Sequence, residues 1–461
     1  MSGIYGVLQT GMRSLQAQQR GIEVTGHNIA NVNTPGYSRQ TVNLKTTTPV
    51  MGSQGMIGTG VTARESERVY DRFVGVQIEN ENEELGRWDA QKTALERVET
   101  IFDESSDSGL SKTMGEFWNA WQDLVNNPSG NVERLALLGN SETLAFEFQN
   151  TYNKFLPLQA DLDISIAATV DEINLKAAEI GDLNQKIIEA EGGGLHANDF
   201  RDARDMAVKD IGLMIDVTTY EESSGSLNVN LKDGSSLVNG SNTSTLSTMA
   251  NDAGYRDVVW ASDPTVSINN TISGGKLKGW IEVRDVIIPG YMSNLEDLAN
   301  GIKGAVNTAH GNGYDLNGDV GGAFFSGTLA GNDFAVHADI VADSTKIAAS
   351  GTALGAPGDN SNAIAIAELQ NALMMNSDTA TFDNYYNSMV SDVGTAVRHA
   401  GMSYDHHTAM VSHLENYRES ISGVSLDEEM VNLIQFQLGY DAAAKLISTT
   451  DELLQTLINM V

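Results

Sequence analysis

The sequence predicts a mainly α protein with a β insertion (α+β): paired terminal coiled-coil helices, a bundle of long helices and a small β-rich outer domain. Three observations support this fold class. Apolar residues recur every seven positions at both ends of the chain, as they do in coiled coils. Long stretches between the ends have the three- and four-residue spacing of amphipathic helices. Two stretches rich in Gly, Asn, Asp and Ser contain short strand candidates.

The first helix is expected to run from the start of the chain to the segment 28–37. Its heptad has two rows, and the interleaved one contains small and polar residues. The apolar row is Leu8, Leu15, Ile22 and Ile29, and the interleaved row is Ile4, Gly11, Gln18 and Thr25. An isolated helix is marginal in water and cannot bury such a face by itself. The two rows therefore predict a partner helix.

The segment NIANVNTPGY (28–37) is expected to end this helix. Asn31 and Asn33 tolerate the left-handed conformation that closes helices. Pro35 and Gly36 suit the two central positions of a turn, and the segment YSRQTVNL that follows has the character of an extended strand. The residues expected to fix the turn are Asn28, Asn31, Pro35 and Tyr37.

Long amphipathic stretches fill the middle of the chain. A helix within 107–130 carries large apolar side chains on one face, which is typical of a core helix: Met114, Phe117, Trp118, Trp121, Leu124 and Val125. Further helices are expected at 131–191, 199–213, 276–310, 363–374 and 381–419. Pro157 should break or kink the first of these, and Pro289 should bend the third.

The strand signals are local. SLNVNLKDGSSLV (226–238) predicts a hairpin with Asp233 and Gly234 in its turn, and short strand candidates lie at 257–272 and 323–342. One small β-rich domain is expected from these segments. The expected domains are a terminal-helix core (1–48 with 420–461), a helical bundle (49–215, 276–320 and 361–419) and the β-rich outer domain (216–275 with 321–360).

The last helix repeats the heptad pattern of the first. Ser425 and Glu428 form a capping-box signature at its start. One row is Leu426, Leu433, Tyr440, Ile447, Leu454 and Val461, and the other is Phe436, Ala443, Thr450 and Leu457. Because a strict heptad favours a coiled coil over an ordinary core helix, we expect the two ends of the chain to pair.

Composition excludes several classes of partner and site. The net charge is −33, from 61 acidic and 28 basic residues, and such a surface repels nucleic acid and anionic membranes. The chain has no cysteine, so disulfides and thiolate sites are excluded. It has no basic segment followed by an apolar run at its start and no long apolar stretch. We therefore expect neither a cleaved signal peptide nor a membrane span.

No motif assigns a catalytic, cofactor-binding or metal-binding residue. GTGVTA (58–63) fits G-x-G-x-x-A, but no buried strand precedes it, so a glycine-rich turn into a strand is expected. DLNGDVGG (315–322) lacks the glutamate that an EF-hand needs at its twelfth position and predicts an Asx-rich turn. His406, His407 and His413 share a helix without an H-E-x-x-H motif and are expected to be solvated or interhelical. We therefore expect neither an enzyme nor a cofactor.

The segment NIANVNTPGYSRQ, placed after such a helix, resembles the bacterial flagellar axial proteins, the family of rod, hook and hook-associated proteins. Other segments are similar to the hook-associated members that join hook to filament. They are GMIGTGVTARESERVYDRFV (55–74), FWNAWQDLVNNP (117–128), GDLNQKIIEAEGGGLHANDFRDARD (181–205), GYDLNGDVGGAFF (313–325), APGDNSNAIAIAELQN (356–371) and SGVSLDEEMVNLIQFQLGYDAAAKLISTTDELLQTLINMV (422–461).

The resemblance implies a structural protein of the hook–filament junction, exported unfolded through the flagellar type III apparatus and located outside the cell. Its implied partners are the flagellar hook protein, hook-associated protein 3, other copies in a ring and a cytosolic export chaperone that covers the C-terminal helix. The turn residues would also touch neighbouring subunits. The expected assembly interface is Ile4, Leu8, Leu15, Ile22, Ile29, Asn28, Asn31, Pro35, Tyr37, Leu426, Leu433, Phe436, Tyr440, Ile447, Leu454 and Leu457.

Two alternatives stay open at this point. The chain could be another axial protein, such as hook or distal rod, although the motifs between 117 and 205 argue against this. It could also be a secreted adhesin or enzyme with its activity in the β-rich domain. That reading would need a convergent polar pocket within 216–360, for which the sequence offers no motif.

Overall fold

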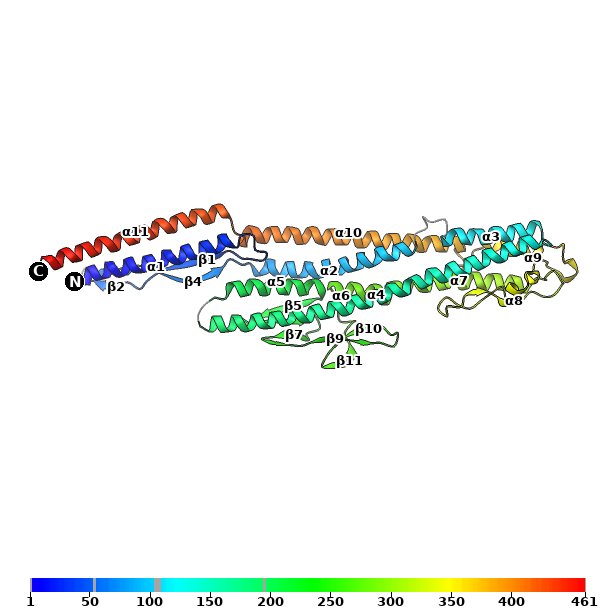
Figure 1. The fold of residues 1–461 in the computed structure, drawn as a ribbon, viewed down its shortest axis with the longest axis horizontal. Helices are drawn as coiled ribbons and strands as arrows, with labels where there is room; N and C mark the ends of the chain where they lie inside the picture. Colours follow the sequence, from blue (N-terminus) through cyan, green and yellow to red (C-terminus); the bar gives the residue numbers. More distant parts are fainter. Residues whose placement is uncertain (1, 53–54, 103–108, 194–195, 461) are drawn as a thin grey trace.

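The computed structural model describes residues 2–52, 55–102, 109–193 and 196–460. The molecule is elongated and mainly helical, and its two chain ends lie together at one tip (Figure 1). The helices are α1 (Ser2–Ala30), α2 (Arg72–Ile101), α3 (Leu110–Asn126), α4 (Asn131–Gly192), α5 (Asn198–Met214), α6 (Gly275–Glu282), the π-helical turn η1 (Val283–Ile287), α7 (Ile288–Gly311), α8 (Ala338–Ala342), α9 (Ser361–Glu368), α10 (Phe382–Ser422) and α11 (Leu426–Asn459).

The strands form several small antiparallel sheets. Near the start, β1 (Gln40–Thr46) pairs with β4 (Val61–Arg68), and β2 (Val50–Gly52) pairs with β3 (Gly55–Ile57). A four-stranded sheet has the order β5-β6-β7-β8, and a three-stranded sheet has the order β11-β10-β9. The strands of these two sheets, followed by the short pair β12 and β13, span Val217–Glu221, Leu227–Leu231, Ser236–Asn239, Asn242–Thr243, Leu246–Ala250, Arg256–Trp260, Asp263–Ser267, Phe325–Ser326 and Ala335–Val336.

A terminal layer forms the tip of the molecule. α1 packs against α11 and also against β1 and β4, and in Figure 1 it lies between α11 and these strands. The Arg13 guanidinium on α1 donates to the Thr59 carbonyl at 3.0 Å, and Gly60 has φ +100° just before β4 begins. The glycine-rich turn into a strand is thus confirmed. Because β4 packs on α1, we assign residues 49–52 and 55–68 to the terminal layer, beyond the expected domain boundary at residue 48.

The first hydrophobic core lies in the half of the molecule far from the tip, between α3, α4, α7, α9 and α10. The expected aromatic face of α3 is buried in it. Phe117, Trp118 and Trp121 are fully buried, and Trp118 stacks on Phe382 of α10 with 6.0 Å between the ring centroids. Burial of such side chains contributes about 1.5–3 kcal/mol each, so this helix anchors the far half.

The second hydrophobic core lies between the C-terminal half of α4, α5, α6 and the sheets β5–β8 and β9–β11. Alternate residues of β6, Leu227, Val229 and Leu231, are buried. This is the pattern of a strand with one face on a core. The hairpin turn at Gly234, which has φ +88°, is confirmed.

The single β-rich domain expected from 216–275 and 321–360 is not formed. Residues 217–281 contribute to the second core, whereas Phe324, Phe325 and Phe334 belong to the first. Phe325 stacks on Phe334 with 5.6 Å between centroids, and the only strands described in 321–360 are β12 and β13, of two residues each. The aromatic side chains of 321–360 are therefore buried in the first core, among helices, and this segment does not pack on the sheets β5–β8 and β9–β11.

The two prolines that were expected to interrupt helices behave differently. α4 continues through Pro157 as one helix of 62 residues. Pro157 is exposed, so water can replace the hydrogen bond that a proline removes. Pro289 is the second residue of α7, which begins directly after the π-helical turn η1. A π turn inserts one extra residue into the helical turn. It therefore shifts the carbonyl group that the proline ring would otherwise contact too closely.

A buried ionic cluster separates the two cores where η1 crosses α4. The Arg284 side chain is fully buried and donates to Asp163 Oδ1 at 2.8 Å and to both oxygens of Asp285 at 2.6 and 2.9 Å. Arg256 completes the pairing of Asp163 at 2.7 Å. The side chain of Gln159 donates to the Arg284 carbonyl at 2.9 Å. Buried charges are tolerated only when they are paired and hydrogen-bonded in this way.

Candidate assembly interface

The two terminal helices pair in an antiparallel arrangement (Figure 1). Residue numbers rise along α1 while those of the facing residues fall along α11. The successive contacts are Gly11 with Ile447, Gln18 with Gly439, Gly21 with Phe436 and Asn28 with Glu429. The expected pairing of the two ends of the chain therefore exists within a single subunit.

Small residues bring the two helix backbones close together. A Cβ atom on Gly21 would lie 2.5 Å from Cδ1 of Phe436, and one on Gly11 would lie 2.9 Å from Cγ1 of Ile447. Both distances are shorter than a van der Waals contact, so these positions require glycine. The close contacts with α11 come from the interleaved row, through Gly11 and Gln18, and from a third row that contains Gly21 and Asn28.

The predicted interface residues divide into three groups. One predicted interface residue, Asn28, is buried. Three others, Pro35, Leu426 and Leu457, are exposed. The half-buried ones are Ile4, Leu8, Leu15, Ile22, Ile29, Asn31, Tyr37, Leu433, Phe436, Tyr440, Ile447 and Leu454. Val461 lies outside the described residues. Of the two rows predicted on α1, the interleaved one makes the close contacts described above, through Gly11 and Gln18, because a residue without a branched side chain allows a closer approach.

α11 leaves a large apolar surface uncovered. Its exposed apolar residues are Leu426, Met430, Val431, Ile434, Leu438, Leu446, Leu453, Leu457 and Ile458, and the exposed Met460 follows its last turn. So many exposed apolar side chains on one helix mark an interaction site. One helix, α1, covers only one side of α11, so the remaining surface is available to other chains.

Asn28 joins the two terminal helices to the first strand. It is 1% exposed, and its amide group donates to the Gln40 carbonyl at 2.9 Å and to Glu429 at 3.1 Å. Its Oδ1 accepts from the Gln40 N–H at 3.0 Å and from the Tyr37 hydroxyl at 2.8 Å. Burial, followed by the nearby Asp199, raises the pKa of Tyr37, so its hydroxyl stays protonated as a donor. Asn28 is thus enclosed by its own chain, which corrects the expectation that it touches neighbouring subunits.

The turn after α1 is centred on Pro35 and Gly36, as predicted. Gly36 has φ +77°, a conformation that glycine adopts without strain, and the Tyr37 N–H donates to the Thr34 carbonyl at 3.2 Å. A Cβ on Gly36 would collide with Met206 of α5. Glycine is therefore required here both by the turn and by the packing of α5.

Asn31 ends the helix by a different route from the one expected. Neither Asn31 nor Asn33 has a positive φ, so the predicted left-handed conformation at these residues is wrong. The Asn31 side chain donates to the His27 carbonyl at 3.0 Å and accepts from the Thr34 hydroxyl at 3.1 Å. Its hydrogen bonds thus satisfy a carbonyl at the helix end, which removes the need for a left-handed residue.

The start of α5 supplies contacts that sequence reasoning missed. Asp202 accepts from the Ser38 N–H at 2.9 Å and from Arg68 at 3.0 Å, and Arg68 also donates to Asp205 at 2.6 Å. Asp199, Asp202 and Asp205 are spaced three apart, which places carboxylates on one helix face. This spacing of acidic residues could have predicted an acidic helix face from the sequence. It could not have predicted that Arg68 is the residue that pairs with that face.

Replacing Asn28 by alanine is expected to loosen the terminal layer. The change leaves the Tyr37 hydroxyl and both backbone groups of Gln40 without these partners, at a cost of about 2–3 kcal/mol. Hydrogen exchange in peptides covering 22–40 should accelerate. The matched control is Asn33→Ala, because Asn33 is exposed. Equal exchange in the two variants would show that Asn28 does not hold the layer.

A small cavity of about 50 Å³ lies where the turn meets α2, α5 and α10. It is lined by Gly36, Tyr70, Glu79, Asp205 and others. Burial raises the pKa of Glu79 to about 7, although a hydrogen bond from the Thr219 hydroxyl opposes the shift. Glu79 is therefore largely protonated in the folded chain below neutral pH, where an unfolded glutamate is already ionised.

We expect Glu79→Gln to make the stability of the fold depend less on pH between about 5 and 8. The folded chain holds a proton on Glu79 that the unfolded chain has lost above its pKa near 4.5, so stability falls as pH rises from there through 7. The loss is on the order of 2 kcal/mol. Thermal midpoints at pH 5 and pH 8 should lie closer together in the variant than in the unchanged chain. Glu96→Gln, at an exposed site on the same helix, should leave the difference unchanged.

The other motifs occupy ordinary structural positions. Asp315 Oδ1 accepts from the N–H groups of Asn317 and Asp319 at 2.7 and 2.9 Å, which forms the expected Asx-rich turn. His407 lies 2.8 Å from Glu81 of α2, which makes it an interhelical contact. None of the helices in the described part of the chain combines the length and the apolar character of a membrane-spanning helix.

Comparison with known protein families shows which family the chain belongs to. The family model described as "Flagellar hook-associated protein FlgK helical domain" matches residues 95–325, just over half of the chain. The chain belongs to the FlgK family of flagellar hook-associated proteins. Two further models match the FlgK-family chain at its ends: "Flagella basal body rod protein" at 8–37 and "Flagellar basal body rod FlgEFG protein C-terminal" at 418–460.

Individual FlgK-family proteins match over the whole length. Flagellar hook-associated protein 1 of Bacillus subtilis (strain 168) is 29% identical, with 100% of this chain and 99% of that protein covered. The protein of the same name from Escherichia coli (strain K12) is 26% identical, with coverages of 98% and 99%. The solved FlgK hook junction protein from Burkholderia pseudomallei shares the fold, with a TM-score of 0.67 and 16% identity over 75% of this chain and 100% of that one.

FlgK-family membership confirms the resemblance drawn from NIANVNTPGYSRQ and the internal motifs. The helical-domain match at 95–325 distinguishes the chain from hook and rod proteins, which was the nearer alternative. The FlgK-family chain is a structural component of the bacterial flagellum.

Proposed function

We propose that this chain is the structural adaptor between the flagellar hook and the filament, held in the axial tube by its paired terminal helices. The observation that carries the proposal is the uncovered apolar surface of α11, which α1 covers on one side only. Apolar surface contributes about 25 cal/mol per Å² when it is buried. Side-by-side packing of the terminal layers of neighbouring subunits would bury it.

The junction at 28–40 gives this adaptor a defined shape. Asn28 bonds to α11 and β1, and Ser38 and Arg68 bond to α5. These buried hydrogen bonds fix the angle between the terminal layer and the helical part. A subunit in the tube would then project its helical part outward in one orientation, which is what a joint between two different polymers requires.

The partners follow from the family and the surface. The terminal layer would contact the hook protein on one side, hook-associated protein 3 on the other, and further copies around a ring. The exposed apolar residues of α11 would be covered by a cytosolic chaperone before export through the flagellar type III apparatus to the outside of the cell. The role is mechanical, and we assign it no catalytic residue and no cofactor.

A truncation tests the proposal. Cells whose own gene is deleted receive the full chain or a chain lacking 441–460, the last turns of α11. The full chain should restore filaments, while the truncated chain should give hooks without filaments and flagellin in the medium, scored by electron microscopy and immunoblot. Normal filaments on cells with the truncated chain would overturn the proposal.

A further inference from the structure

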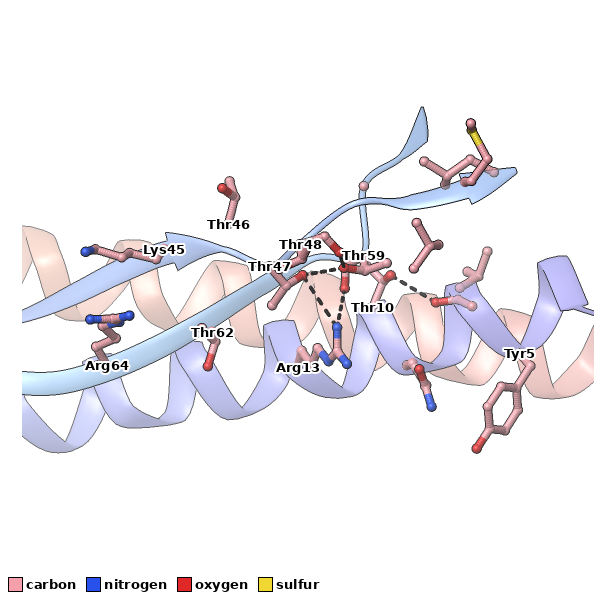
Figure 2. Close-up of a pocket in the computed structure, with 17 residues that line it drawn as sticks. Tyr5, Thr10, Arg13, Lys45, Thr46, Thr47, Thr48, Thr59, Thr62 and Arg64 are labelled. Atoms are coloured by element: carbon pink, nitrogen blue, oxygen red, sulfur yellow. Dashed lines mark hydrogen bonds between the residues drawn. The ribbon is translucent and has the colours of Figure 1, made fainter. Parts of the chain in front are cut away.

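A groove of about 1130 Å³ opens on the strand side of α1 (Figure 2). Its floor is the first turns of α1, and its walls are β1, the β2–β3 hairpin and the start of β4. Arg13 and Thr47 hold the walls in place: Arg13 donates to the Thr59 carbonyl at 3.0 Å, and the Thr47 and Thr59 hydroxyls are 2.6 Å apart. The groove is therefore part of the folded terminal layer.

The groove is basic in a strongly acidic protein. No lining residue is Asp or Glu, although the chain contains 61 acidic residues. Three lining residues, Arg13, Lys45 and Arg64, are cationic. In the part of the chain that the structure describes, none of the three has a carboxylate within ion-pairing distance. An occupant that neutralises these charges must therefore bring its own carboxylates.

The groove also exposes large apolar side chains. Tyr5 and Val7 of α1 and Val50, Met51 and Ile57 of the hairpin line it, and all five are exposed, Met51 at 82%. Monomeric proteins seldom leave such groups together in water unless a partner covers them. The occupant is accordingly an amphipathic segment with both apolar and acidic residues.

The last turns of α11 have this chemistry. Leu446, Leu453 and Leu457 are exposed, and Asp451 and Glu452 lie between them, also exposed. Among the described residues, no cation pairs with either carboxylate. The apolar and acidic groups of this segment thus match the apolar and basic groups of the groove.

The groove and the last turns of α11 cannot meet within one chain. α1 stands between α11 and the strands, and the antiparallel pairing places both surfaces at the same tip (Figure 1). Two different surfaces on separate sides of one layer can join only different copies. A contact of this type is heterologous and repeats from copy to copy, producing a ring or a helical array.

We propose that the basic groove receives the last turns of α11, around Leu453 and Asp451, from a second copy of this chain. The inference rests on the proposed function, in which copies assemble side by side, and it specifies which two surfaces meet. It predicts one directed contact between neighbours.

Cysteine cross-linking tests the contact directly, because the chain has no cysteine of its own. Chains carrying Thr46→Cys, Leu453→Cys or both are expressed in cells lacking the native gene, and isolated flagella are treated with a short bismaleimide. The double variant should give covalent dimers and larger oligomers, while each single variant, and the control Thr265→Cys on β11, should stay monomeric. Double-variant chains that are present in the flagella but remain monomeric would overturn the inference.

A charge exchange provides the second test. Lys45→Glu with Arg64→Glu should lower the share of cells bearing filaments by about tenfold, as should Asp451→Lys with Glu452→Lys. A chain carrying all four changes should regain filaments, because opposite charges face each other again. Failure of the fourfold variant to recover would contradict the groove contact. Absence of every variant and of the unchanged chain from purified flagella would instead contradict the proposed function itself.

Discussion

Gly21→Leu is expected to separate α11 from α1 and to abolish filament growth. Even a Cβ at this position would lie 2.5 Å from Phe436, and three further carbons cannot fit without moving the helices apart. Overpacking of this kind costs about 1–3 kcal/mol, and a helix that loses its partner is only marginally stable in water. Hydrogen exchange in peptides from 426–459 should approach that of an unpaired helix, and complemented cells should show hooks without filaments.

The chain offers a matched control and a rescue for this change. Gly26 lies on the exposed side of the same helix with no atom near its missing Cβ, so Gly26→Leu changes the helix equally without touching α11. Adding Phe436→Ala to Gly21→Leu restores the space and should recover part of the protection and of the filaments. Equal defects in the Gly21 and Gly26 variants would show that close approach at Gly21 is not the cause.

Arg284→Met is expected to give the largest loss of stability in the helical part. The change leaves Asp163, whose side chain is 10% exposed, with Arg256 as its ionic partner and removes both bonds to Asp285. Breaking a buried pair by removing one partner costs about 3–5 kcal/mol. Denaturant unfolding followed by circular dichroism should show a lower midpoint for the transition that includes α4.

An exposed ion pair to α4 serves as a control, because it shows how much stability is lost when an ion pair is removed without burial. Arg97 pairs with Asp161 of α4, and both side chains are about half exposed, so Arg97→Met should cost less than about 1 kcal/mol. Asp163→Asn added to Arg284→Met removes the stranded charge and should regain part of the midpoint. If the Arg97 and Arg284 variants lose the same stability, burial of the Arg284 cluster is not what makes its ion pairs costly to break.

Much of the local structure was predictable because helix spacing and turn chemistry are properties of neighbouring residues. The aromatic face of α3, the helix expected at 199–213, which the structure shows as α5, and the Pro35–Gly36 turn follow from such patterns. Predictions failed where the outcome depended on surroundings. Pro157 does not break α4 because it happens to face water. Phe324 and Phe325 pack in the first core, and not against the β5–β11 sheets, because other aromatic side chains of that core surround them.

By itself, the sequence determined that both ends are heptad helices, each with a face that another helix must bury, and that the chain belongs among flagellar axial proteins. Only the tertiary structure decided that the pairing is antiparallel, that glycines and not leucines mark its closest approach, and that Asn28 is bonded to Glu429, 401 positions away. The reason is physical: periodicity shows that a face must be buried, but complementarity between two distant surfaces is a property of their shapes together. The groove on the strand side of α1 was also decided by the tertiary structure, since residues from α1 and four separate strands create it only after folding.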